Sequence, residues 1–199
     1  MRKLHVLAIA CLIILSFLLS ACRCPSCYRQ EETVVPREVL IKTNNFIKQR
    51  TGNEFFEKYI TPDFVKTKYV APYFNMVYRF VMPDKSYVNE LIEFSVDTLG
   101  NIVRDRDIVG IPNCIDADCS FNITEEQVIK IAKDNGLQKG IKDWKTGLIW
   151  DAKLNQYVWH ILSTDWASEG PQGFRGSGKE AIIDPNTGLI LAMNDWHVN

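Results

Sequence analysis

The sequence has few histidines and no surplus of basic residues. It contains three histidines in 199 residues, and His5 lies in an N-terminal segment that we expect to be removed. His160 and His197 have no nucleophile motif beside them, which argues against a catalytic triad or a histidine-based metal site. The 23 basic and 24 acidic residues give a net charge of −1. Such a chain has no electrostatic basis for binding nucleic acid. We expect no catalytic residue, no metal and no cofactor.

Two ligand-binding motifs are present only in part. Residues 173–179 have the spacing of a phosphate-binding P-loop, but Glu180 follows where Ser or Thr would hold Mg²⁺. The segment also leads into a predicted strand, whereas the motif needs a helix N-terminus. Residues 116–122 alternate oxygen-bearing side chains as a calcium loop does. However, Phe121 stands where that loop needs glycine, and Gln127 where it needs a bidentate glutamate.

A long hydrophobic run occurs once, at the N-terminus. Arg2 and Lys3 precede apolar residues from 6 to 19, and the run ends in Leu19-Ser20-Ala21-Cys22. A charged start, an apolar stretch and small residues are typical of a secretory signal peptide, which we place at residues 1–21. The last four residues resemble the lipobox of bacterial lipoproteins, in which the cysteine carries lipid. We therefore expect lipidation at Cys22; the alternative is a plain secretory signal with Cys22 as an ordinary thiol.

Lipidation at Cys22 implies a location and a charge. The mature chain would lie outside the cytoplasm in the cell envelope, held to a membrane by two or more acyl chains, because one chain binds only marginally. Arg23 follows the cysteine instead of Asp, which indicates the outer membrane in a double-membraned bacterium. Removal of residues 1–21 leaves 21 basic and 24 acidic residues, a net charge of −3.

Four further cysteines would remain in the mature chain. Cys24, Cys27, Cys114 and Cys119 permit up to two disulfides in an oxidising compartment, with three connectivities. Closeness in sequence favours Cys114 with Cys119 and Cys24 with Cys27. A zinc site built from the two pairs is an alternative. Residues 24–27 also have the spacing of a thioredoxin-type redox pair, but such a pair needs a helix N-terminus and this one lies beside the anchor.

Beyond a polar tether at residues 22–35, the same pattern occurs twice. In the first copy an apolar face predicts a helix from about Pro36 to Thr51-Gly52, with Val39, Leu40, Thr43, Phe46 and Ile47 on that face. A connecting stretch ends near residue 62. Two predicted strands follow, at residues 73–82 and 87–96, joined by a Pro-Asp-Lys-Ser turn.

The second copy begins with a clear helix start. Thr124 can cap the helix, Gln127 can return the bond, and Ile123 can pack onto Val128. The predicted buried stripe is Val128, Ile129, Ile131 and Ala132, and Asn135-Gly136 ends the helix. Strands are predicted at residues 148–152, 157–164, 180–184 and 189–193. Gly100 and Gly188 are offset by 88 residues between the copies, as are Leu40 and Val128.

The second copy resembles the PepSY domain, a small module of peptidase propeptides and many exported bacterial proteins. The resemblance lies in residues 123–132 and 180–191, covers about residues 120–193, and extends weakly to residues 36–104. It implies a helix packed on an antiparallel sheet, and binding or inhibition of a partner rather than catalysis. We therefore expect an α+β fold with two modules, at residues 36–110 and 111–199, each a helix packed on a small meander sheet.

The function that follows is non-covalent binding of a protein or peptide partner. Inhibition or regulation of a peptidase is one form that such binding could take. The Gly-rich stretch at residues 168–179 is predicted to be an irregular loop that interrupts two strands, too polar to serve the core. The candidate contact residues are Trp166, Ser168, Gly170, Gly173, Phe174 and Arg175, beside a strand edge that could pair with an extended peptide. A tolerated insertion without a role is the alternative.

A second functional interpretation comes from the C-terminal ending. It is also similar to the ending of small immunity proteins that neutralise bacterial toxins, some of which have an NTF2-like cone. Neutralisation of a toxin is therefore the alternative function.

Overall fold

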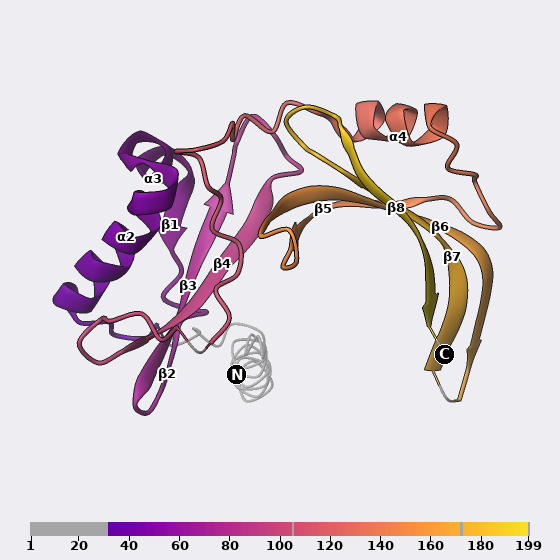
Figure 1. Cartoon of the computed structure of the whole chain (residues 1–199). Helices are drawn as coiled ribbons and strands as arrows, with labels where there is room; N and C mark the ends of the chain where they lie inside the picture. The colour runs from indigo at the N-terminus through magenta and orange to yellow at the C-terminus, as the bar shows by residue number, and fades with distance from the viewer. Residues whose placement is uncertain (1–31, 105, 172, 199) are drawn as a thin grey trace, which may run out of the picture. The chain divides into compact units, whose positions relative to one another are not determined.

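Two segments, each with helix before sheet, follow one another in the computed structural model, which describes residues 32–104, 106–171 and 173–198. These residues form three helices and two antiparallel sheets (Figure 1). The predicted α+β class is confirmed at this level. The predicted signal peptide and Cys22, Cys24 and Cys27 lie outside the described residues. No helix among the described residues is both long and apolar enough to span a membrane.

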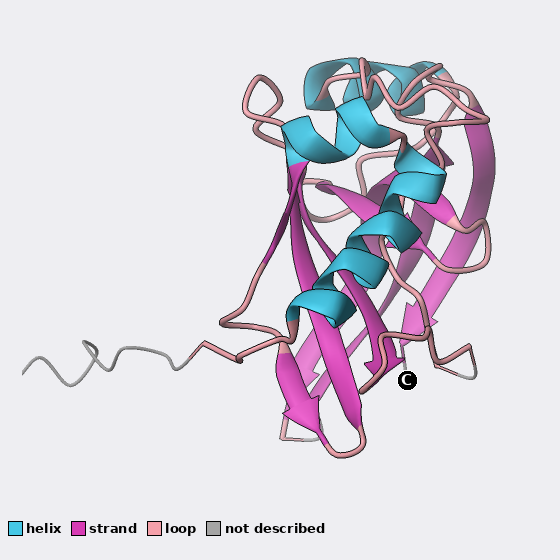
Figure 2. Ribbon diagram, turned by 90° about the vertical axis from the view of Figure 1, so that its left-hand side faces the viewer, coloured by secondary structure: helices cyan, strands magenta, loops and turns pink. Residues whose placement is uncertain are grey.

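The first helix matches its prediction. Helix α2, Arg37–Thr51, begins after Pro36 and ends at Gly52, whose φ of 81° is open mainly to glycine. Val39, Thr43 and Ile47 are buried along one side, because residues three and four apart share a helix face. Figure 2 shows α2 lying across the strands of the first sheet.

The stretch after Gly52 is more structured than predicted. It contains helix α3, Asn53–Tyr59, and the short strands β1, Ile60–Pro62, and β2, Lys68–Val70. The expectation of a mere connecting stretch was wrong here. Elements of seven and three residues are too short to show a hydrophobic period, so the sequence pattern could not reveal them.

The first sheet is not a simple meander. Its long hairpin of β3, Tyr73–Val81, and β4, Asn89–Asp97, lies where strands were predicted. Strands β1 and β2 both pair with β3, at opposite ends of that strand. Thr33, which we had assigned to the tether, donates its backbone N–H to the Phe64 carbonyl at 2.8 Å. The folded part therefore begins before Pro36.

The second segment has the predicted helix and a four-stranded meander. Helix α4, Glu125–Asp134, carries the expected capping box between Thr124 and Gln127. Val128 and Ala132 are buried, but Ile129 is 37% exposed, so its place in the predicted buried stripe was wrong. A short helix that packs along one i, i+4 row leaves its flanking residues uncovered. The strands are β5, Lys145–Asp151, β6, Gln156–Gly170, β7, Gly173–Ile183, and β8, Ile190–Val198, paired in that order.

The two segments share one turn design. Asp97 accepts the backbone N–H groups of Leu99 and Asn101, and the Gly100 N–H returns to the Asp97 carbonyl. In the second segment the Asp184 side chain accepts two backbone N–H groups, and the Gly188 N–H returns to the Asp184 carbonyl at 3.0 Å. Gly100 and Gly188 have φ values of 79° and 75°. Each glycine also lies against the helix of its own segment.

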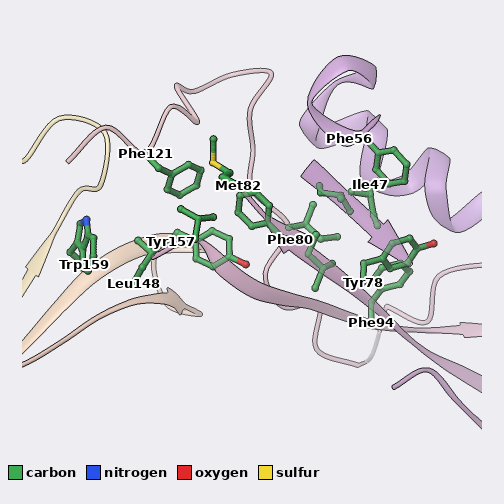
Figure 3. Packing of buried hydrophobic residues seen from close by; sticks show 14 of the residues in the cluster. Ile47, Phe56, Tyr78, Phe80, Met82, Phe94, Phe121, Leu148, Tyr157 and Trp159 are labelled. Carbon is green, nitrogen blue, oxygen red and sulfur yellow. The ribbon is translucent and has the colours of Figure 1, made fainter. Parts of the chain in front are cut away.

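The buried apolar residues of both segments form one continuous core (Figure 3). The Phe80 ring of the first sheet lies 5.6 Å from the Tyr157 ring of the second, and Phe121 contacts both. The Tyr157 hydroxyl donates to the Gly110 carbonyl at 3.0 Å, and burial raises the pKa of this tyrosine. The domain boundaries near residue 110 remain a prediction.

Candidate functional site

The predicted irregular loop at residues 168–179 is a β-hairpin, so that expectation was wrong. Strand β6 continues to Gly170 and strand β7 begins at Gly173, and these two glycines pair with each other. The P-loop spacing at residues 173–179 accordingly lies within strand β7. The glycines misled the prediction because they were taken as a sign of an irregular loop. In strands, glycine also marks a close approach of backbones.

The backbones of β7 and β6 approach each other closely at Gly178. A Cβ atom built on it would lie 2.0 Å from the Ser163 carbonyl oxygen. The ladder shifts register between Thr164 and Trp166, which leaves Asp165 as the extra residue of a bulge. Across the strands, Thr164, Gly178 and Trp196 are partners in one row. The Trp196 indole Nε1 donates to the Ser163 carbonyl at 2.8 Å, so β8 is tied to β6 across the glycine.

The hairpin brings most of the predicted contact residues together. Ser168 pairs with Arg175, and Gly170 with Gly173. With Pro171 these four residues line a pocket of about 260 Å³ at the hairpin end. Phe174 pairs with Glu169 and is 43% exposed, while Trp166 lies further along β6, opposite Ser177, and is 52% exposed. Neither Phe174 nor Trp166 lines that pocket.

Strand β8 forms one edge of the second sheet. Among the described residues its backbone pairs with β7 alone, and no other backbone hydrogen bond reaches it. Its sequence, Ile-Leu-Ala-Met-Asn-Asp-Trp-His-Val, has neither proline nor lysine. Those residues are common means of blocking an edge strand against further pairing. Met193 and Val198 of this strand are exposed, so β8 offers both backbone groups and apolar side chains.

A histidine–carboxylate pair lies on the second sheet beside this edge, in addition to the ion pair of Lys179 with Asp195. The His160 Nε2 atom is 2.7 Å from Glu180 Oε2, and the Asn194 amide of β8 donates to Glu180 Oε1 at 3.0 Å. Burial by itself would raise the pKa of Glu180. The hydrogen bonds from Asn194 and His160 outweigh it and hold that pKa below its ordinary value of 4.5. The pair therefore links strands β6, β7 and β8 through side chains.

Sequence reasoning missed the segment that leads from α4 to β5. The Ile141 N–H donates to the Thr164 carbonyl at 2.7 Å, at the bulge. The Lys142 Nζ lies 5.9 Å from the Phe174 ring centroid, within cation–π distance. The available sequence signal was the row of exposed lysines around Ile141, which no helix or strand period explains.

The predicted disulfide is present. Cys114 and Cys119 are bonded to each other with their Cα atoms 5.2 Å apart. The N–H groups of Cys114 and Ile115 donate to the Arg50 carbonyl in the last turn of α2. The loop between the cysteines is therefore fastened to the first helix as well as closed on itself.

The polar residues of the rejected calcium motif serve local contacts. Asp118 accepts both the backbone N–H and the hydroxyl of Ser120. The Asn122 side chain accepts a hydrogen bond from Lys85 at 2.9 Å. No group of three or more His, Cys, Asp or Glu side chains in the described ranges has a metal-binding arrangement.

The comparisons with known proteins do not assign the chain to a family. No family model matches the sequence. No curated protein matches it either.

Proposed function

We propose that this chain is a lipid-anchored envelope protein that binds a protein or peptide partner non-covalently, by adding an extended segment of the partner to strand β8. The PepSY-like resemblance motivates a binding role in place of catalysis. The observation that carries the proposal is the edge of β8, whose backbone pairs on one side only among the described residues. Strand addition uses such an edge, with backbone bonds supplying affinity and side-chain pockets supplying specificity.

The surroundings of β8 favour this binding mode. Trp166, Ser177 and His197 are partners in one row across β6, β7 and β8. An exposed tryptophan and a histidine near the edge offer contact area at a small cost in side-chain entropy. Trp196 is held by the Ser163 carbonyl, so the C-terminal half of β8 is ordered before any partner arrives. Preorganisation lowers the entropic cost of binding.

Two proline substitutions test the edge. In an antiparallel edge strand the N–H groups of neighbouring residues point alternately toward the sheet and away from it. Of Ala192→Pro and Met193→Pro, one therefore breaks the β7 ladder, and the other removes an outward donor and leaves that ladder intact. The variant that leaves the β7 ladder intact is recognised by its unchanged melting temperature.

The variant that keeps its melting temperature is the informative one. We expect full-length wild-type protein, crosslinked in its native envelope and solubilised in detergent, to retain a partner that this variant loses. Lys153→Glu, in the turn between β5 and β6, is the control and should retain it. Equal capture by the proline variant would mean that the edge of β8 is not the contact.

A further inference from the structure

A groove lies beside α4, and none of its lining residues belongs to β8. Its volume is about 640 Å³, within the usual range of ligand sites. One wall is the helix face of Ile129 and Lys133, four residues apart, and Leu137 and Trp144 form an apolar floor. Leu137 is buried, and Trp144 is half-buried. Gln138, Lys139 and Asp143, from the segment between α4 and β5, form the opposite wall. Figure 1 shows the path of that segment.

The opposite wall is held in place although its side chains are exposed. The Gln138 carbonyl accepts two hydrogen bonds, from the Trp144 indole Nε1 at 3.0 Å and from the Ser163 hydroxyl at 2.5 Å. Gly140 forms a parallel bridge with Thr164. A Cβ atom on Gly140 would lie 2.2 Å from the Thr164 carbonyl oxygen, so the segment lies directly on the sheet. These contacts preorganise the groove without filling it.

Among the residues that line the groove, Lys133 and Lys139 outnumber Asp143, although the chain as a whole has a net negative charge. Between Ile129 and Lys145 the sequence has five lysines and two aspartates. Lys130 and Lys139 pair with Asp134 and Asp143, respectively. Lys133 lines the groove and has no ion pair within the described part of the chain. A positive charge beside an apolar floor is complementary to a ligand that is both apolar and anionic.

We propose that this groove binds an acidic peptide segment, with a bulky apolar side chain against Ile129 and Trp144 and a neighbouring carboxylate at Lys133. The concave shape favours a peptide over a lipid bilayer, which presents a flat surface. This inference goes beyond the strand-addition function and does not depend on it, because none of the groove residues belongs to β8.

Fluorescence anisotropy with labelled peptides tests the proposal on the full-length protein in zwitterionic detergent. The probe is a short peptide with the core Glu-Phe-Glu-Leu-Glu. Its comparators are Lys-Phe-Lys-Leu-Lys, which reverses the charge, and Glu-Ser-Glu-Ser-Glu, which lacks apolar side chains. We expect the first peptide alone to bind. Equal binding of either comparator, or no binding of the probe, overturns the proposal.

Matched variants locate the binding. Lys133→Glu should weaken binding of the probe by about three- to tenfold, the range of a moderate charge–charge interaction. Ile129→Ser should weaken it too. Lys153→Glu and Ile149→Ser alter an exposed lysine and a similarly exposed isoleucine elsewhere, and should leave it unchanged. If the control variants weaken binding as much as the groove variants, the peptide binds elsewhere and the inference is wrong.

Two further arms separate the peptide from other anionic amphiphiles. Palmitate and phosphatidylglycerol vesicles are added in turn as competitors. We expect that neither competitor displaces the probe from the Lys133 site of the wild-type protein. Displacement by either that Lys133→Glu abolishes would show that the groove takes lipid, which overturns the peptide proposal. The β8 proline variant that keeps its melting temperature should bind the probe normally. The outcome of this experiment is therefore independent of strand addition.

Discussion

The indole of Trp196 reaches the carbonyl oxygen of Ser163 at 2.8 Å across Gly178. This contact needs the missing side chain at Gly178 and the bulge at Asp165. It joins the edge strand proposed for partner binding to the middle of the sheet. A change at Gly178 should therefore affect both folding stability and the edge.

We predict that Gly178→Ala destabilises the protein by about 1–3 kcal/mol, the usual cost of forcing extra atoms into a packed site. The added Cβ would lie 2.0 Å from a backbone oxygen, which cannot rotate away as a side chain can. Urea unfolding measures the change. Gly147→Ala is the control, because a Cβ there would have its nearest neighbour at 3.8 Å. Equal stability of the two variants would contradict the close approach.

We predict that Gly188→Val lowers the melting temperature more than Gly136→Val does. Both glycines have positive φ, so a β-branched residue is strained by roughly 1 kcal/mol or more at either position. Gly136 has open space around it, whereas a Cβ on Gly188 would meet Ile131 of α4 at 2.9 Å. The difference between the melting temperatures of the two variants measures how much the packing of the Asp184 turn on α4 contributes to stability. Identical melts would show that this packing contributes nothing.

The parts of the fold that the sequence revealed have strong local signals. The capping box at Thr124 and the glycine ends of α2 and α4 each depend on a few neighbouring residues. The disulfide closes a loop short enough to be inferred from spacing. These features do not depend on where the rest of the chain lies, so sequence pattern suffices to find them.

The missed features depend on residues far apart in sequence. Phe121 adopts a φ of 48°, unusual for an aromatic residue, and its N–H bonds to Asn186 across the core. The hairpin at residues 168–179 resembled a loop because of its glycines. One of them, Gly178, instead makes room for the Ser163 carbonyl, a contact that periodicity cannot reveal. The groove wall at residues 137–144 likewise follows from the bulge in β6. Such features follow from tertiary contacts.

We predict that Cys114→Ser costs about 2 kcal/mol of stability under non-reducing conditions, since a short closed loop constrains the unfolded chain less than a long one. Peptide mapping without reductant should recover Cys114 and Cys119 in one linked pair. Adding reductant to the wild-type protein should reproduce the loss, and should leave the variant unchanged. Mapping that joins either cysteine to Cys24 or Cys27 would contradict the pairing.

We predict that Cys22 carries lipid. Mass spectrometry of the native protein should find a chain that begins at Cys22 and bears two or three acyl groups. Cys22→Ser should abolish incorporation of labelled palmitate, because the acyl groups would be attached through the Cys22 side chain and amino group. An unmodified Cys22, or cleavage elsewhere, would leave the chain without the proposed anchor.

We predict that Glu180 makes stability sensitive to acid. The hydrogen bonds from His160 and Asn194 hold its pKa below 4.5 in the folded chain. A carboxyl whose pKa is lower when folded contributes stability that is complete above the unfolded pKa and is lost as pH falls through the folded one. Urea unfolding between about pH 6 and about pH 3 should show this loss in wild type.

Two variants assign that acid sensitivity to the ion pair. Glu180→Gln should be less stable than wild type near pH 6, because the amide cannot form the same ion pair with His160, and the gap should narrow toward pH 3. Glu169→Gln changes an exposed carboxyl on the same hairpin and should follow the wild-type curve. If the difference in unfolding free energy between Glu180→Gln and wild type stays constant with pH, Glu180 acts only through packing and neutral hydrogen bonds. A difference that narrows as expected would assign part of the acid-induced loss of stability to protonation of Glu180.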